Sequence, residues 1–168
     1  MSMKDLQKGI NLAEKFFTKQ ENAFSTKKPP LLVDTAEQIL GVKFPLTYRT
    51  FVETKGHGGP GNVFIPGIFE NDLNKIKDSG VVWGVLEDRN GLGYPMHLIK
   101  LYDVGEGTTY CLDTSQMNEE GECPVVAWPL GGYEETPVLE VVAEDFGKFF
   151  LDMVHRQIEY KKGSLIPS

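Results

Sequence analysis

Residues 37–51 read EQILGVKFPLTYRTF, and this stretch contains two helix signals separated by a turn. Asp34 and Glu37 have the spacing of a capping box, which predicts the start of a short helix that Gly41 ends with a left-handed cap. Pro45 suits the first turn of a second helix, because the missing N–H of proline costs nothing there. The stretch therefore predicts two short helices in succession.

Helical periodicity also appears near both ends of the sequence. Apolar residues at steps of three and four predict an amphipathic helix over residues 4–21. The second helix predicted from residues 37–51 is expected to reach Lys55, and the glycine-rich turn 56–61 follows it. A final helix is expected over residues 143–160, because its apolar residues fall on one face, and residues 161–168 are expected to fray.

Between these helices the pattern changes to short β-rich runs, with one more short helix expected over residues 69–77. Runs rich in β-branched and aromatic residues, bounded by Gly, Asn and Asp, are typical of strands. Such runs occur at residues 63–65, 81–86, 97–102, 108–112, 124–128 and 138–142. The order of elements predicts an α+β fold, with a mostly antiparallel or mixed sheet of about five to six strands flanked by N- and C-terminal helices. A chain of 168 residues suits a single domain, 1–168.

The charge of the chain is distributed unevenly. The formal net charge is −7, but residues 1–102 carry +2, residues 103–160 carry −11 and residues 161–168 carry +2. A negative field repels the phosphates of nucleic acid and attracts a cationic partner. We therefore expect no direct binding of nucleic acid and favour a cationic protein partner, while ordinary solubility is the alternative explanation of the acidity.

The sequence carries no signal for export or for the membrane. The first residues lack the apolar block of a secretory signal, and no stretch approaches the roughly 20 apolar residues of a membrane helix. The two cysteines, Cys111 and Cys123, fit neither a zinc site nor a redox motif, and both are expected to be reduced. These features predict a cytoplasmic protein without membrane contact.

The residues that chemistry requires are missing or scattered. The histidines His57, His97 and His155 have no acidic or cysteine neighbour at the spacing of metal ligands. No GxSxG elbow is present, and the glycine-rich turn lacks the Lys-Ser/Thr pair of a phosphate-binding loop. We expect no metal, no cofactor and no catalytic residues.

Three segments resemble those of a known family. Residues 37–51, followed by Gly58-Gly59, resemble the opening signature of the SUKH superfamily: a Glu, Leu-Gly, a hydrophobe with Pro, a Tyr, a Phe and then a Gly-Gly turn. Residues 109–114, leading to residues 121–128, are similar to a strand pair of the YobK-type immunity proteins of bacilli. Residues 142–150 resemble the closing helix of the family. The resemblance spans residues 34–155 and leaves the first helix and the tail outside.

This resemblance implies an α+β fold and no catalytic residues. Bacterial members are commonly immunity proteins for polymorphic toxins, often nucleases, while fungal relatives regulate cell-wall synthesis. We therefore expect a toxin-neutralising immunity protein, or antitoxin, whose acidic surface binds and blocks a cognate toxin that is a cationic nuclease domain. The alternative is a non-catalytic regulatory or scaffold module that binds a basic partner, and the oligomeric state stays open.

Two further features are left open by the sequence. An enzymatic role would rest on adjacent carboxylates alone, the pairs Glu87–Asp88 and Glu134–Glu135. Residues 83–94 do not match the family pattern, and they are expected to form either a specificity surface or a long loop.

The expected partner-binding residues are acidic side chains at strand ends and turns, together with two aromatic residues. Large aromatics anchor interfaces, and Trp83 and Tyr94 are candidates on the same ground, although an aromatic on a strand is more often part of the core. Asp113 directly follows a strand, and its alternative role is to form a hydrogen bond within its own turn. The full set is Glu87, Asp88, Asp103, Glu106, Asp113, Trp128, Tyr133, Glu134 and Glu135. The motif residues Gly41, Pro45, Tyr48, Phe51, Leu112 and Val126 are expected to be structural.

Overall fold

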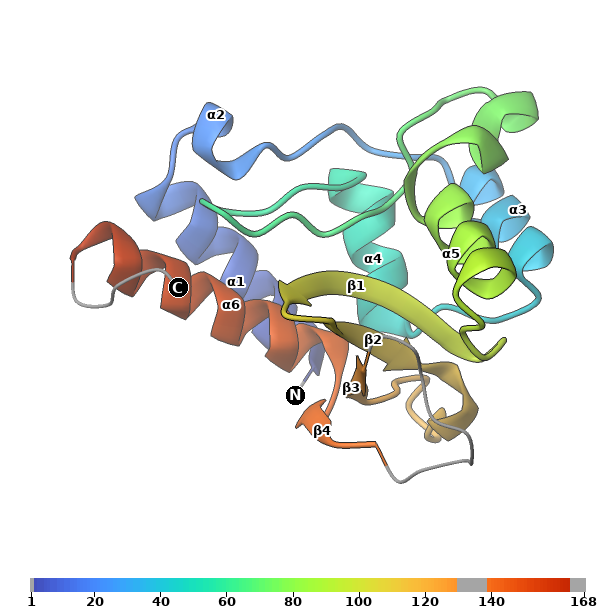
Figure 1. The fold of residues 1–168 in the computed structure, drawn as a ribbon. Helices are drawn as coiled ribbons and strands as arrows, with labels where there is room; N and C mark the ends of the chain where they lie inside the picture. The colour runs from blue at the N-terminus through green and yellow to red at the C-terminus, as the bar shows by residue number, and fades with distance from the viewer. Residues whose placement is uncertain (1, 130–138, 164–168) are drawn as a thin grey trace.

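A computed structural model describes residues 2–129 and 139–163 of the chain, and Figure 1 traces its fold. Most helices come first, the sheet follows and one long helix closes the chain, which confirms a single α+β domain. In chain order the elements are α1 (Ser2–Phe16), α2 (Lys19–Asn22), α3 (Pro30–Leu40), α4 (Leu46–Lys55), η1 (Leu73–Asp78), α5 (Gly80–Gly91), β1 (Leu98–Gly105), β2 (Thr108–Asp113), η2 (Thr114–Gln116), β3 (Val125–Pro129), β4 (Val141–Ala143) and α6 (Phe146–Lys161).

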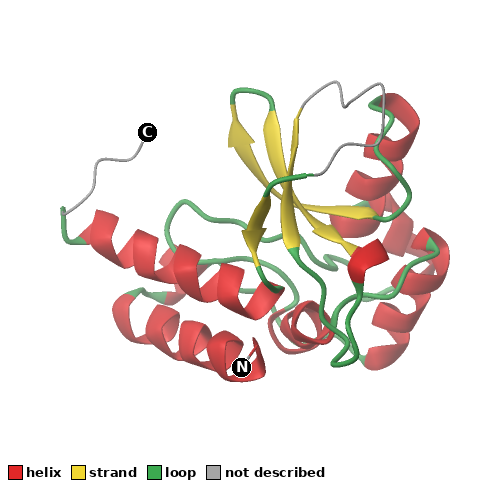
Figure 2. Cartoon of the chain, turned by 90° about the horizontal axis from the view of Figure 1, so that it is seen from below, coloured by secondary structure: helices red, strands yellow, loops and turns green. Residues whose placement is uncertain are grey.

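The sheet is an antiparallel meander with the strand order β1-β2-β3-β4. The described residues form four strands, slightly fewer than the sequence predicts, and the antiparallel pairing is confirmed. Because neighbours in sequence are neighbours in space, β1 and β4 are the two edges. Figure 2 shows the sheet standing above the α1–α6 pair and α4, with further helices at one side.

Helices α1 and α6 lie side by side along one end of the molecule, as Figure 1 shows. Two glycines allow this close approach. A Cβ atom on Gly9 would lie 2.8 Å from the Phe150 ring, and a Cβ on Gly147 would meet the backbone of Ser2. The first helix is therefore packed into the core, although the family motif in the sequence begins only after it.

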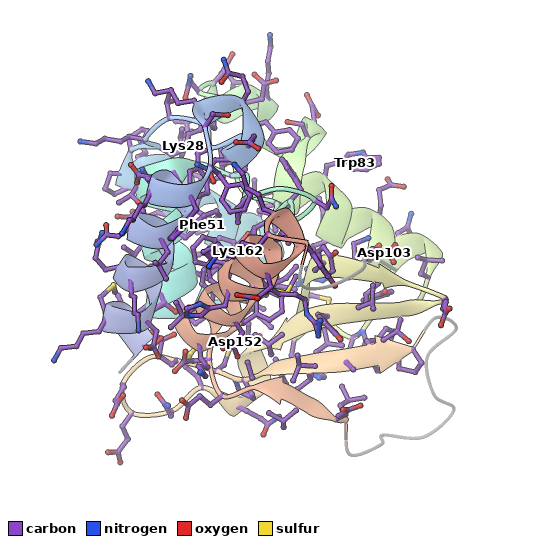
Figure 3. All side chains as sticks on the ribbon, turned by 90° about the vertical axis from the view of Figure 1, so that its left-hand side faces the viewer. Lys28, Phe51, Trp83, Asp103, Asp152 and Lys162 are labelled. Atoms are coloured by element: carbon purple, nitrogen blue, oxygen red, sulfur yellow. The ribbon has the colours of Figure 1, made fainter. Side chains whose placement is uncertain are left out.

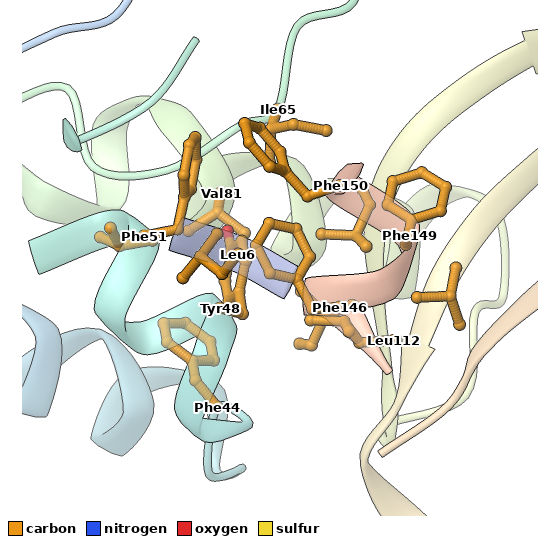
Figure 4. Close-up of a cluster of buried hydrophobic side chains, with 14 of the residues drawn as sticks. Leu6, Phe44, Tyr48, Phe51, Ile65, Val81, Leu112, Phe146, Phe149 and Phe150 are labelled. Atoms are coloured by element: carbon orange, nitrogen blue, oxygen red, sulfur yellow. The ribbon is translucent and has the colours of Figure 1, made fainter. Parts of the chain in front are cut away.

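The main core is built from aromatic rings of α4 and α6. The Tyr48 ring meets the Phe146 ring edge-on at 5.2 Å, and Phe51 lies 5.5 Å from Phe150 (Figure 4). The Tyr48 hydroxyl donates a 2.6 Å hydrogen bond to the carbonyl of Pro66. The structural role predicted for the motif residues is confirmed. Gly41 caps α3 in the left-handed conformation. The others are buried: Pro45, Tyr48, Phe51, Leu112 and Val126.

The two faces of the sheet take part in different apolar clusters. The face toward the helices contributes Ile99, Leu112 and Val125 to the main core. The outer face carries a smaller cluster of its own: Tyr94, Leu98, Cys111, Val126 and Trp128. Both faces of the central strands are therefore covered.

Glu37, the first residue of the stretch 37–51, is a buried carboxylate that joins α3 to α4. Its Oε2 accepts a 2.7 Å hydrogen bond from the backbone N–H of Phe44, and its Oε1 accepts one of 2.7 Å from Arg49. Arg49 also pairs with Asp34 at 2.8 Å and Glu53 at 2.6 Å. A buried charge is tolerated only when such partners surround it.

The strand predicted over residues 81–86 is wrong, because these residues belong to helix α5. Val81, Val82 and Val85 are buried, and their spacing of one and then three residues also fits one face of a helix. This face packs against η1 and α3, and tertiary packing outweighs the strand propensity of valine. Residues 83–94, which the family pattern does not place, are thus mostly helix rather than a long loop.

Other boundaries also differ from the sequence prediction. The predicted strand at residues 63–65 is reduced to an isolated bridge between Gly58 and Ile65. The first helix ends at Phe16, and the capping box observed in this region belongs to Thr18 and Glu21 at the start of α2. Asp34 is not a helix cap, because α3 already begins at Pro30. Part of the last predicted strand, at residue 138, lies outside the described residues.

We expect Glu37→Ala to destabilise the fold by about 2 kcal/mol, because it leaves the buried N–H of Phe44 without an acceptor. Urea denaturation measures the loss. Glu53→Ala is the matched control, since it also removes a carboxylate from Arg49, but one that is 30% exposed, and it should cost less than about 1 kcal/mol. Equal losses in the two variants would contradict the role of Glu37.

Candidate protein-binding surface

Three predicted acidic residues come together where α5 passes the edge strand β1. Glu87 and Asp88 lie on α5, Asp103 lies on β1, and the charges of Glu87 and Asp103 both act to raise the pKa of Asp88. Figure 3 labels Asp103 on the sheet close to α5. We call Glu87, Asp88 and Asp103 the acidic edge.

Asp88 is the buried member of the acidic edge. Its Oδ1 accepts a 3.2 Å hydrogen bond from the ammonium group of Lys100 on β1. Burial is the largest influence on the Asp88 pKa and raises it, while Lys100 lowers it. Asp88 therefore joins α5 to the sheet, and the exposed side chains of Glu87 and Asp103 are the ones that a partner would meet.

Glu106 extends the exposed acidic surface onto the β1–β2 hairpin. It is exposed and adopts a left-handed conformation with φ 54° between two glycines of positive φ. Asp103 helps to shape the same turn, because its Oδ1 accepts a 2.9 Å hydrogen bond from the N–H of Gly105. The hairpin backbone that carries Asp103 and Glu106 is therefore fixed by a hydrogen bond within the turn.

Asp113 lies apart from this surface, at the other end of β2. It is buried, and its Oδ1 accepts hydrogen bonds from the N–H of Ser115 at 3.1 Å and from its hydroxyl at 2.6 Å. Its Oδ2 accepts a further bond of 2.6 Å from Gln116. The alternative role given to Asp113, bonding to its own turn, is thereby confirmed, and the residue is not available on the surface.

The aromatic candidates divide into buried and exposed residues. Trp128 is 6% exposed and packs at 5.8 Å from Tyr94, whose hydroxyl lies 2.8 Å from that of Thr109. Trp83 is 50% exposed on α5, and Figure 3 shows it at the surface above Asp103. The exposed Trp83 is therefore the better interface candidate, while Trp128 belongs to the outer core cluster.

The remaining predicted residues, Tyr133, Glu134 and Glu135, lie outside the described residues and stay predictions. Sequence reasoning missed Lys100, the cation that compensates Asp88. One signal was present: Lys100 interrupts the apolar run Leu98-Ile99-Lys100-Leu101, and a single cation in a buried strand calls for a carboxylate partner.

The described residues offer little for covalent or metal chemistry. Cys111 and Cys123 are free and buried, and burial raises the pKa of each thiol to about 12, so neither is a ready nucleophile. Within residues 2–129 and 139–163, no group of three or more His, Cys, Asp or Glu side chains is arranged to hold a metal ion. None of the described helices is both long and apolar enough to cross a membrane.

Comparison with known proteins identifies the family to which the chain belongs. A family model described as SUKH_5, SMI1-KNR4 cell-wall, matches residues 10–155. The chain therefore belongs to the SMI1-KNR4 family of the SUKH superfamily. Proteins of this family are generally non-catalytic immunity or regulatory modules. The comparison with curated proteins gives no match.

The pair of Lys100 and Asp88 has a measurable pH signature. We expect Lys100→Met to cost about 1–3 kcal/mol at neutral pH, because the buried carboxylate loses its cation. Without Lys100 the pKa of Asp88 rises further above its usual range, so protonation on acidification removes the buried charge and the deficit shrinks as the pH falls from neutral into the mildly acidic range.

Urea denaturation of both proteins across this pH range measures the effect. The double variant Asp88→Asn/Lys100→Met is the control, because it removes both charges and should lose the pH dependence of the deficit. A deficit in Lys100→Met that is constant with pH would show that Asp88 is not the responsible group.

Proposed function

We propose that this chain is an immunity protein that binds a cognate toxin and blocks it with the exposed carboxylates of the acidic edge and the hairpin. The observation that carries the proposal is the grouping of Glu87, Asp103 and Glu106 along one edge of the sheet, in a member of a family of immunity and regulatory modules. The resemblance of residues 109–128 to the YobK-type immunity proteins points in the same direction.

Electrostatics supports a cationic partner. A nuclease needs a cationic surface to hold nucleic acid, and an acidic protein that covers this surface excludes the substrate. The net charge of −7, with −11 in residues 103–160, would speed the association. The protein would act in the cytoplasm by occupying the toxin rather than by chemistry of its own, without touching nucleic acid.

The first test is growth of a bacterial host that expresses a toxin domain encoded beside this chain, with and without the protein. We expect rescue by the natural sequence and its loss in Glu87→Lys/Asp103→Lys, because reversed charges repel the cationic toxin. For the purified proteins, we expect the double variant to slow association by about tenfold or more at low salt.

The matched control is Glu119→Lys/Glu120→Lys. It makes the same change of charge on exposed residues in the connection between β2 and β3, and it should keep both rescue and rapid association. If the acidic-edge variant rescued growth as well as this control, the toxin would bind elsewhere.

A second candidate is a regulatory or scaffold module that binds a basic partner, and the description of the matching family model, which names the cell wall, favours it. The growth experiment separates the two. Failure of the natural protein to rescue growth, against a toxin shown to be active, would leave the scaffold role as the better explanation.

A further inference from the structure

A second surface feature lies between α6, the β1–β2 hairpin and the loop that follows Gly61. It is a hollow of about 260 Å³, which we call the tyrosine hollow. Its polar lining comes from three parts of the chain that are far apart in sequence: Asn62, Tyr102, Tyr110, Arg156, Gln157 and Tyr160. The expected set of partner-binding residues includes none of them, and only Tyr110 falls in a segment that resembles the family, residues 109–114.

The floor of the hollow is held rigidly. Tyr102 and Tyr110 are paired across β1 and β2, with ring centroids 6.4 Å apart. The Tyr110 ring also meets the Phe149 ring of the core edge-on at 6.0 Å. Gln157 is buried, and its Oε1 accepts a 3.0 Å hydrogen bond from the N–H of Asn62, which fixes the loop to α6. This part of the lining is therefore organised before any ligand binds, and Arg156 stands exposed beside it on α6.

The hollow gathers hydrogen-bond donors without an anion. Within the described part of the chain, Arg156 forms no ion pair, and the hydroxyls of Tyr102, Tyr110 and Tyr160 form no hydrogen bond. None of the described lining residues is a carboxylate. In a chain of net charge −7, this is a site with one unpaired guanidinium and no negative charge to satisfy it.

These donors define the ligand chemistry. A guanidinium offers paired N–H groups that match the two oxygens of a carboxylate, and tyrosine hydroxyls can donate to the same oxygens. Val104 and Met153 complete the lining and suit the apolar stem of a side chain. Tyrosine, arginine and methionine are also the residues enriched in protein interfaces.

We propose that the tyrosine hollow binds the carboxylate of an aspartate or glutamate side chain presented by a partner protein. The proposal goes beyond the acidic edge, because it assigns a site of opposite charge preference, and it does not require the partner to be a toxin. Val104 lines the hollow and follows Asp103 directly on β1, so both surfaces include residues of this edge strand.

The test is NMR titration of the isotope-labelled protein with N-acetylglutamate methylamide, a blocked residue whose only charge is the side-chain carboxylate. We expect saturable shifts of the Arg156 guanidinium and the Tyr102 and Tyr110 ring signals, with a dissociation constant on the order of 1 mM, as suits so small a probe. The glutamine analogue, which lacks the charge, should give no saturable shift.

Two variants keep the proposal falsifiable. Arg156→Gln should weaken binding of the glutamate probe about tenfold or more. Tyr160→Phe removes one hydroxyl and should weaken it by a factor of about three. Lys8→Gln, the matched control, removes an exposed cation from α1 and should leave binding unchanged.

Three outcomes would overturn the proposal: no saturable shift with the glutamate probe, equal shifts with the glutamine analogue, or unchanged binding in Arg156→Gln. Saturable shifts with inorganic phosphate but not with the glutamate probe would also overturn it, in favour of a phosphate ligand. None of these results depends on whether the chain neutralises a toxin, so the two proposals fail separately.

Discussion

The burial of Tyr48 between two other aromatic rings is the contact on which the rest of the architecture depends. Its ring lies 5.1 Å from Phe44 and 5.2 Å from Phe146, so one side chain joins the turn before α4 to the closing helix α6. Its hydroxyl is bonded to the carbonyl of Pro66, and burial raises the pKa of this tyrosine well above its usual range. Because α6 also packs against the sheet, the position of Tyr48 relates helices and strands to one another.

The start of α4 is fixed by two buried carboxylates from distant parts of the chain. Glu37 accepts from the N–H of Phe44, and Glu122 accepts from both the N–H and the hydroxyl of Thr47. Negative charge is favoured at this end of a helix, which compensates part of the cost of burying it. Glu122 and Asp113 thus serve the interior, so the acidity of residues 103–160 overstates the charge that a partner meets.

The sequence was a good guide wherever local rules decide the structure. Gly41 ends a helix because its conformation demands glycine, and the antiparallel strands follow from short β-rich runs joined by turns. It failed where packing decides, as in α5, whose valines suit a strand equally well. The same error hid the pair of Asp88 and Lys100, because only a helix brings Asp88 onto the sheet beside this cation. Trp128 was misjudged because the outer face of the sheet has a core cluster of its own.

Strand β1 and its hairpin contribute residues to both proposed binding surfaces, the acidic edge and the tyrosine hollow. Pairing of β1 with β2 is irregular between Lys100 and Tyr102, so Leu101 and Tyr102 both pack toward the helices, while Lys100 and Asp103 act on Asp88. One strand therefore directs Asp103 toward the acidic edge and Tyr102 toward the hollow whose charged group is Arg156. A partner with only cationic residues would satisfy one surface and leave the other unpaired or repelled. Specificity arises from better contacts with the right partner, from a penalty against the wrong one, or from both, and two surfaces of opposite charge would add the second means to the first.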